Sequence, residues 1–391
     1  MDFRLSKEQI MMRQTIREFA QNEVKPMSRK LDAKVDPKEC FSWELVRKAS
    51  KLGLRLLPLP VEYGGSGITD QLTQVIIMEE LGAADLGFAS VFRSQISLVD
   101  MLIRLCNEKQ KEEFIPKLVK DDTYLLAACM AEPDHGTDTA IPYDAPGEGM
   151  ETFGERRGEE YIINGAKHFT SNGGVAKLYF VYARTNRKLS LAKSLSLFMV
   201  PHDTPGFSIG SIHNKLGRRL LMNAEEVFQD VRIPVQYLVG KENNAWEERK
   251  ILGPVGLLHS ATQLGTLRAC YEEALAYAKI RIQGGKPIIE HTNIGAKLGE
   301  MRIKIEAVKR LIWWNAWCWD NGHEYDPKMH WLIKGLTDEV TLDILNHTVD
   351  IFGGIGTDKD SPIEKYIRDL YTILHGFGTR EISLAKVASA L

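Results

Sequence analysis

A β-rich stretch lies between two long helical regions, and this order constrains the fold more than any other feature of the sequence. Apolar residues recur at helical spacing before and after it, whereas the middle contains runs such as KLYFVYAR (177–184) that are typical of strands. We therefore predict a mostly helical α+β protein with a central β domain. The predicted domains are residues 1–125, 126–237 and 238–391.

Local signals place several elements. The pair Ser6 and Gln9 forms a capping-box pattern that predicts the start of the first helix. Asn164-Gly165 stands between two apolar runs and predicts a hairpin turn, because both residues readily adopt positive φ. A stripe of apolar residues predicts one long helix from about residue 257 to 278. Further helices are predicted over 291–321, 327–349 and 361–390.

Composition excludes some classes of function. The 391 residues carry 50 basic and 52 acidic side chains, so no strong field attracts nucleic acid or an anionic membrane. No apolar run is long enough to span a bilayer, and the N-terminus does not resemble a signal peptide. The five cysteines show no paired spacing, so we expect reduced thiols and a cytoplasmic protein. The histidines show no metal-binding spacing, so we expect no metal site.

Seven short motifs, taken in order, resemble the acyl-CoA dehydrogenase family over essentially the whole chain. They are YGGSG (63–67), CMAEPDHGTD (129–138), INGAKHFTSNG (163–173), KLGRR to VFQDVRIP (215–234), YAKIRIQGGKPIIEH (277–291), VDIFGGIGT (349–357) and SPIEKYIRD (361–369). The resemblance implies a helical N-terminal domain, a β-barrel-like middle domain and a C-terminal four-helix bundle. It also implies FAD, an acyl-CoA substrate, an electron-transfer flavoprotein as acceptor, and a homotetramer or a hetero-oligomer with a related subunit.

The resemblance assigns cofactor contacts to particular residues. The turn-rich segment EPDHGTD has backbone N–H groups that could take a phosphate oxygen. Phe169 and Ser171 match an aromatic ring over the flavin and a hydroxyl near its N5, and Arg281 matches an arginine that reaches the diphosphate of a neighbouring subunit. No GxGxxG motif follows a strand, so a Rossmann site is not supported. The implied cofactor-binding residues are Cys129, Met130, Ala131, Gly136, Thr137, Phe169, Thr170, Ser171, Arg281, Asp350, Gly353, Gly354, Thr379 and Glu381.

The usual catalytic base is missing. Members of this family usually remove the α-proton with a glutamate, and Phe377 stands at that position after the Arg368-Asp369 pair. A phenyl ring cannot accept a proton. Some members place the glutamate on the long helix, where this chain has Val255, followed by Gly256. Two further family residues are replaced, by Ala131 and by Gly284.

Other side chains could supply a base or bind the substrate. Asp85, Asp100, Tyr371 and His375 are weak alternatives for the base, each with a structural role as the plainer interpretation. Arg93 lies in an otherwise small and apolar helix segment and could pair with a distal carboxylate of a dicarboxylic acyl group, or with a neighbouring acidic residue. The predicted substrate-binding residues are Arg93, Thr137, Val255, Phe377 and Gly378.

Three functions fit this pattern. The first is an acyl-CoA dehydrogenase for an unusual acyl-CoA, whether cyclic, branched or dicarboxylic, with a relocated base. The second is a flavin enzyme of the same fold that needs no base, such as a monooxygenase or an enzyme that expels a leaving group. The third is a catalytically inactive subunit that supports an active partner chain.

Overall fold

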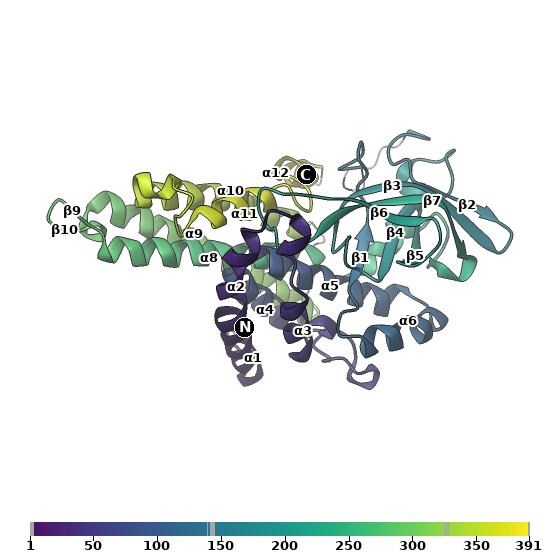
Figure 1. Ribbon diagram of the computed structural model, residues 1–391, viewed down its shortest axis with the longest axis horizontal. Helices are drawn as coiled ribbons and strands as arrows, with labels where there is room; N and C mark the ends of the chain where they lie inside the picture. Colours follow the sequence, from purple (N-terminus) through teal and green to yellow (C-terminus); the bar gives the residue numbers. More distant parts are fainter. Residues whose placement is uncertain (1–3, 139, 141–144, 324–325, 327, 390–391) are drawn as a thin grey trace.

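The computed structural model describes residues 4–138, 140, 145–323, 326 and 328–389. Figure 1 shows three parts: N-terminal helices, a β domain on one side, and an elongated arm of C-terminal helices on the other. The C-terminus lies near the middle of the molecule, between the arm and the β domain. The predicted α+β class with helical, β and helical parts is confirmed.

The N-terminal part is helical as predicted. Ser6 and Gln9 form the capping box, with the Gln9 N–H donating to Ser6 Oγ at 3.1 Å and the Ser6 N–H donating to Gln9 Oε1 at 3.0 Å. A π-helical turn (Ala20–Val24) joins the first two helices. The helices are α1 (Lys7–Phe19), α2 (Lys25–Asp32), α3 (Trp43–Lys51), α4 (Gln71–Ala84), α5 (Leu86–Leu105) and α6 (Glu108–Lys120).

The middle part is one eight-stranded sheet. The order along it is β6-β7-β3-β2-β4-β5-β8, and β1 pairs in parallel with β4. Strands β4 and β5 are almost entirely buried, as their continuous apolar runs indicate. The strands are β1 (Leu126–Cys129), β2 (Phe153–Arg157), β3 (Glu160–Ser171), β4 (Leu178–Arg184), β5 (Leu195–Pro201), β6 (Phe207–Ile212), β7 (Asn223–Pro234) and β8 (Leu238–Val239).

The hairpin predicted at Asn164-Gly165 is wrong. Strand β3 runs straight through this dipeptide, and its register against β7 shifts there. The Asn164 amide donates to Asp230 Oδ1 at 3.0 Å and its oxygen accepts the Asp230 N–H at 2.8 Å, so the pair forms a cross-strand irregularity. The turn into β3 lies earlier, at Gly158 and Glu159, between residues that pair across β2 and β3.

The C-terminal part contains the longest helices. Helices α8, α9 and α10 run side by side along the arm, whose tip carries the small β9–β10 hairpin (Figure 1). The predicted segment 361–390 is divided into two helices by the residues around Phe377. The elements are α7 (Ala245–Glu248), α8 (Val255–Ile280), β9 (Ile282–Gln283), β10 (Lys286–Pro287), α9 (Thr292–Asp320), α10 (Met329–Phe352), α11 (Glu364–Ile373) and α12 (Arg380–Ala388).

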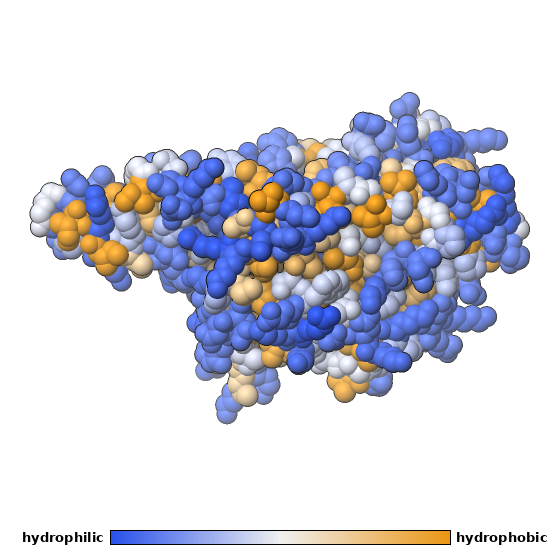
Figure 2. All heavy atoms as spheres, in the orientation of Figure 1, coloured by the Kyte–Doolittle hydropathy of each residue, from blue (hydrophilic) through white to orange (hydrophobic). Residues whose placement is uncertain are grey.

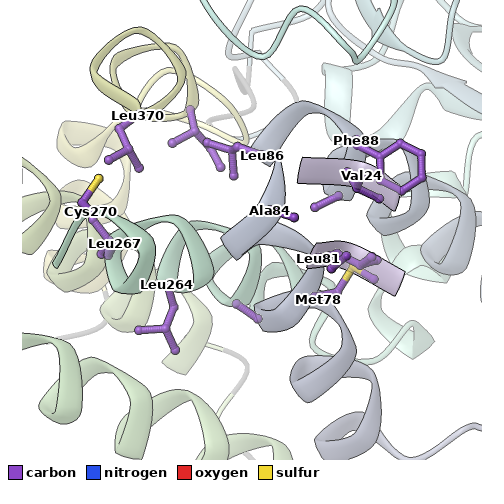
Figure 3. Packing of buried hydrophobic residues seen from close by; sticks show 14 of the residues in the cluster. Val24, Met78, Leu81, Ala84, Leu86, Phe88, Leu264, Leu267, Cys270 and Leu370 are labelled. Carbon is purple, nitrogen blue, oxygen red and sulfur yellow. The ribbon is translucent and has the colours of Figure 1, made fainter. Parts of the chain in front are cut away.

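Helix α8 holds the N-terminal and C-terminal parts together. Leu264, Leu267 and Cys270 of α8 share one buried cluster with Met78 and Leu81 of α4 (Figure 3). The two backbones nearly touch, because a Cβ added to Gly82 would lie 2.1 Å from the carbonyl oxygen of Thr262 on α8, and one added to Gly265 would lie 2.0 Å from that of Glu79. Only glycine permits this approach.

The prediction that no apolar run is long enough to span a bilayer needs a correction at helix α5. By length and composition it could cross a membrane, but 78% of its apolar window is buried inside the protein. A buried core helix passes the same test. In the face shown in Figure 2, apolar patches are scattered among hydrophilic ones and form no continuous band.

Candidate active site

The loop between α11 and α12 presents Phe377 in a strained conformation. Its φ is 62°, in the left-handed region that large side chains avoid, and Gly378 follows with φ 92°. The ring is 41% exposed. Its centroid lies 5.6 Å from that of His259 on α8 and 6.4 Å from that of Trp331 on α10. The position predicted for a base therefore holds an aromatic ring packed against a histidine.

Asp85 has a structural role. Its carboxylate caps α5 by accepting the Phe88 N–H at 2.7 Å, and it also contacts Ser28 Oγ at 2.5 Å and Lys365 Nζ at 2.7 Å. Although burial acts in the opposite direction, the Lys365 ammonium holds the pKa of Asp85 below its ordinary value. A carboxylate with these partners is a poor proton acceptor.

The other weak alternatives for the base have local contacts or are exposed to solvent. Asp100 pairs with Arg104 at 2.7 Å. Tyr371 is 42% exposed, and the exposed His375 contacts the Tyr371 carbonyl oxygen at 3.2 Å through Nδ1. Val255 is the first residue of α8, but its side chain lies outside what the structure describes.

Four basic side chains from four elements gather around the Phe377 loop. They are Arg93 of α5, Arg218 before β7, His259 of α8 and Lys334 of α10. A Cβ added to Gly376 would lie 3.2 Å from Arg218 Nη1 and 3.4 Å from His259 Cε1. Arg93 is partly buried, and the other three are at most 7% exposed. We call these four residues the basic cluster.

The basic cluster carries unbalanced charge. Lys334 pairs with Asp338, but within the described residues no carboxylate forms an ion pair with Arg93 or Arg218. Their guanidinium groups donate instead to Ser94 Oγ at 3.0 Å and to Ser90 Oγ at 2.8 Å. Burial and the nearby Arg218 lower the pKa of Arg93 to about 9, so it stays protonated at pH 7. Buried cations without a partner are costly, which indicates a site for an anion.

The β domain brings together one group of the predicted cofactor residues. Phe169 has φ 55° and a 55% exposed ring that stacks on His213 at 4.2 Å. Thr170 is buried, and Ser171 ends β3. Ala131 is tied to this strand, since its carbonyl oxygen accepts the His168 N–H at 2.8 Å. An exposed, strained aromatic ring of this kind fits a surface that receives a flat ligand.

The segment from Cys129 to Thr137 leads away from the end of β1 and is attached to β3 through Lys167. Cys129 is fully buried at the end of β1, and the Met130 carbonyl oxygen accepts from Lys167 Nζ at 3.2 Å. The Lys167 ammonium also pairs with the buried Glu132 at 2.8 Å, which holds the start of the loop. A Cβ at Gly136 would meet nothing within 4 Å, so the backbone beside Thr137 is open to a ligand.

A second group of predicted cofactor residues lies at the far end of the arm. Arg281 follows α8 and lines a cavity of about 540 Å³ with Gly353 and Gly354, which follow α10. A Cβ at either glycine would meet nothing within 4 Å. Asp350 forms an ion pair with Lys297 on α9. Arg281 lies 22 residues after His259, a rise of about 33 Å along α8.

Thr379 and Glu381 begin α12, close in sequence to Phe377. Thr379 occupies the N-cap position, and Glu381 is the acidic residue of the first turn. Gly378 permits the turn between Phe377 and this helix through its positive φ. Their predicted contacts with a cofactor stay a prediction.

Sequence reasoning missed three members of the basic cluster. His259 could have been found, because it lies one helical turn after Val255 and therefore on the same face of α8. Arg218 stands within the motif KLGRR, but nothing in that motif indicates that its side chain approaches Gly376. Lys334 is contributed by α10, and no local pattern connects it to the others.

Family models cover almost all of the chain. The N-terminal domain of acyl-CoA dehydrogenases matches residues 6–122, the middle domain residues 127–231 and the C-terminal domain residues 252–391. The chain belongs to the acyl-CoA dehydrogenase family. It is therefore an FAD-dependent oxidoreductase of a family that acts on acyl-CoA thioesters. The exact bounds of the three predicted domains, residues 1–125, 126–237 and 238–391, remain a proposal.

Relatives of this acyl-CoA dehydrogenase match along their full length. The short-chain-specific acyl-CoA dehydrogenase of Clostridium acetobutylicum is 33% identical, over 98% of this chain and 97% of the relative. The butyryl-CoA dehydrogenase structure from Megasphaera elsdenii is 29% identical with a TM-score of 0.90, covering 100% and 99% of the two chains. A glutaryl-CoA dehydrogenase in complex with glutaryl-CoA is 25% identical with a TM-score of 0.88, covering 99% and 96%.

Proposed function

We propose that this acyl-CoA dehydrogenase introduces a double bond between the α- and β-carbons of an acyl-CoA whose acyl chain ends in a carboxylate. The observation that carries the proposal is a pair of guanidinium groups, those of the partly buried Arg93 and the buried Arg218, that form no ion pair with a carboxylate of the described residues. A distal carboxylate would satisfy both groups through charge-assisted hydrogen bonds. Cyclic or branched acyl groups offer no such charge.

FAD fits the residues at two places in the chain. When bound, FAD supplies the acceptor for the hydride that leaves the β-carbon. The exposed ring of Phe169 and the open backbone at Gly136 support binding in the β domain. Arg281, with the open glycines Gly353 and Gly354, supports binding of the diphosphate at the tip of the arm.

The distance along α8 supports a shared cofactor site. Arg281 lies about 33 Å along the helix from the Phe377 region, beyond the length of one extended FAD molecule. We therefore include in the proposal that a second subunit contributes Arg281, as in a homotetramer or a hetero-oligomer. An electron-transfer flavoprotein as acceptor and a cytoplasmic location complete the proposal, and these rest on the family resemblance and the composition.

The proposal is tested with flavin-loaded protein under anaerobic conditions. Glutaryl-CoA is expected to bleach the flavin absorbance at least 10-fold more efficiently than butyryl-CoA, since hydrogen bonds to a charged group contribute about 1.5–3 kcal/mol. Arg93→Met is expected to remove this preference. Arg104→Met, an arginine that pairs with Asp100 on the same helix, is the matched control and keeps it.

Three results would contradict the proposal. Equal bleaching by both thioesters would show that the basic cluster does not read a distal carboxylate. Bleaching by neither, followed by oxygen consumption with a chemical reductant, would favour the monooxygenase alternative. A colourless protein that gains FAD only with a related chain would favour the inactive subunit.

A further inference from the structure

His259 is a titratable ring packed beside Phe377, the position at which the usual base is absent. It projects from α8, is 2% exposed, and its ring faces that of Phe377 at 5.6 Å with an interplanar angle of 30°. Its Nε2 atom is buried and has no hydrogen-bond partner among the described residues. A buried imidazole nitrogen without a partner loses the hydration that it would have in water. The unpaired Nε2 atom therefore indicates a position where a ligand makes contact.

The groups around His259 are mainly positive. Lys334 faces it from α10, Arg93 from α5 and Arg218 from the segment before β7. Asp338 lies next to Lys334 and is paired with it. Asp85 and Asp369 lie near Arg218 and attract its guanidinium group, but the ion pairs of both carboxylates are with the single ammonium of Lys365. The ring is therefore neutral at pH 7, in the form that can accept a proton.

We infer that His259 accepts the α-proton of the bound acyl-CoA, in place of the carboxylate that Phe377 has replaced. This inference rests on the proposed function. The Cα–H bond breaks, its proton goes to Nε2 of His259, and its electron pair forms the new bond between the α- and β-carbons. Bound FAD would accept the β-hydrogen with its electron pair as hydride, so atoms and electrons balance.

Binding of the substrate raises the basicity of His259. A distal carboxylate bound between Arg93 and Arg218 cancels part of the positive charge that now disfavours protonation of His259. The imidazole becomes more basic only when that carboxylate is present. An acyl-CoA without a terminal carboxylate would leave His259 a weak base. Binding of the acyl chain and removal of the proton therefore both favour a chain that ends in a carboxylate.

The ring of Phe377 lies beside the His259 ring that carries the buried Nε2 atom. Phe377 is held at positive φ between Gly376 and Gly378. Glycine on both sides leaves the backbone free to rotate. The ring must move aside when the acyl chain enters, and the strained φ lowers the cost of leaving this conformation.

Proton uptake on binding tests the inference without turnover. Calorimetric titration of the wild type, its flavin reduced beforehand with dithionite, with glutaryl-CoA at pH 6.0 in buffers of different ionisation enthalpy is expected to show uptake of a fraction of a proton. His259→Gln is expected to abolish the uptake while keeping the dissociation constant within about threefold. His202→Gln, an exposed histidine of the β domain, is the matched control and retains the uptake.

Exchange at the α-carbon gives the second readout. Release of deuterium from α-deuterated glutaryl-CoA, and the rate of flavin bleaching, should both fall by about 10²- to 10⁴-fold in His259→Gln, the usual contribution of a general base. His259→Asn is made in parallel, in case Gln impairs folding. In either variant, wild-type α-exchange together with wild-type proton uptake would overturn the inference.

The inference and the proposed function can fail separately. If the wild type bleaches with glutaryl-CoA and both histidine variants match it, His259 is not the base but the proposed function stands. If the wild type neither binds nor is bleached by glutaryl-CoA, the proposed function fails first.

Discussion

Helix α8 passes through two buried charged regions that differ in how their charge is balanced. At Arg268, the guanidinium pairs with Glu79 at 3.1 Å and with Glu80 at 2.7 Å, and Arg13 of α1 also reaches Glu80, at 2.7 Å. At His259, Arg93 and Arg218 lack a carboxylate partner among the described residues. The first region is complete within the chain and joins helices. The second has the charge of a site whose partner is a ligand.

The difference teaches which buried charges are structural. Although burial acts in the opposite direction, the guanidinium groups around Glu80, led by Arg268, lower the pKa of this carboxyl to about 2. In the basic cluster the pKa of His259 also falls, well below its ordinary value, but there burial and the neighbouring cations destabilise the charged form instead of stabilising it. Charges that stabilise one another hold a fold together, whereas charges that repel one another are retained for function.

The largest expected effect is in the balanced region. Glu80→Gln leaves three guanidinium groups facing a neutral amide and should lower the free energy of unfolding by about 3–5 kcal/mol. Denaturant unfolding measures it. Glu300→Gln, whose carboxylate pairs with Lys304 and His347 at the surface, is the control and should unfold like the wild type. Equal stability of the Glu80 variant would remove the basis of the comparison.

Supplying the missing charge should stabilise the second region. Phe377→Glu places a carboxylate beside His259 and Arg218, and hydrogen bonds to charged groups contribute about 1–3 kcal/mol. The melting temperature should rise above that of Phe377→Gln, which has the same length without the charge. We expect FAD to stay bound, because the sequence predicts that this position faces the substrate. Loss of flavin in the Glu variant would show that Phe377 is placed wrongly.

Acid should weaken the folded protein through His259. An unfolded histidine takes up a proton below about pH 6.5, whereas the folded site resists protonation, so the unfolded state binds more protons there. Stability attributable to this site should fall by up to about 1.4 kcal/mol for each pH unit below 6.5. The contribution of His259 is measured by comparing the free energies of unfolding of the wild type and His259→Gln between pH 5 and 8. Parallel curves would mean that His259 titrates normally.

The smallest expected effect on stability is that of replacing Arg93, and it distinguishes this arginine from Arg268. Arg93→Met removes an unbalanced buried cation and should change the free energy of unfolding by less than about 1 kcal/mol. Arg268→Met, made in parallel, leaves Glu79 and Glu80 without their shared partner and should be clearly destabilising. If Arg93→Met were as unstable as Arg268→Met, the Arg93 side chain would be structural.

Much of the fold could be predicted because its signals are local. The capping box at Ser6 and Gln9, the apolar stripe of α8 and the buried runs of β4 and β5 each depend on neighbouring residues. The hairpin turn predicted at Asn164-Gly165 was wrong because distant contacts decide the structure there. The turn preference of this dipeptide was overridden by hydrogen bonds to Asp230, 66 residues away.

The missing base at Phe377 was evident from the sequence, since it depends only on position within a motif. The basic cluster was not evident, because its four members come from elements separated by up to 241 residues, from Arg93 to Lys334. No local pattern records which side chains share one buried space.

By itself, the sequence determined the family and the order of helical and β parts, and it predicted that a hydrocarbon ring at Phe377 replaces an acid. Only the tertiary structure decided that His259, Arg93 and Arg218 meet beside that ring, and that no carboxylate of the described chain forms an ion pair with either arginine. The physical reason is that periodicity and motif spacing act along the chain, whereas charge balance and burial act through space.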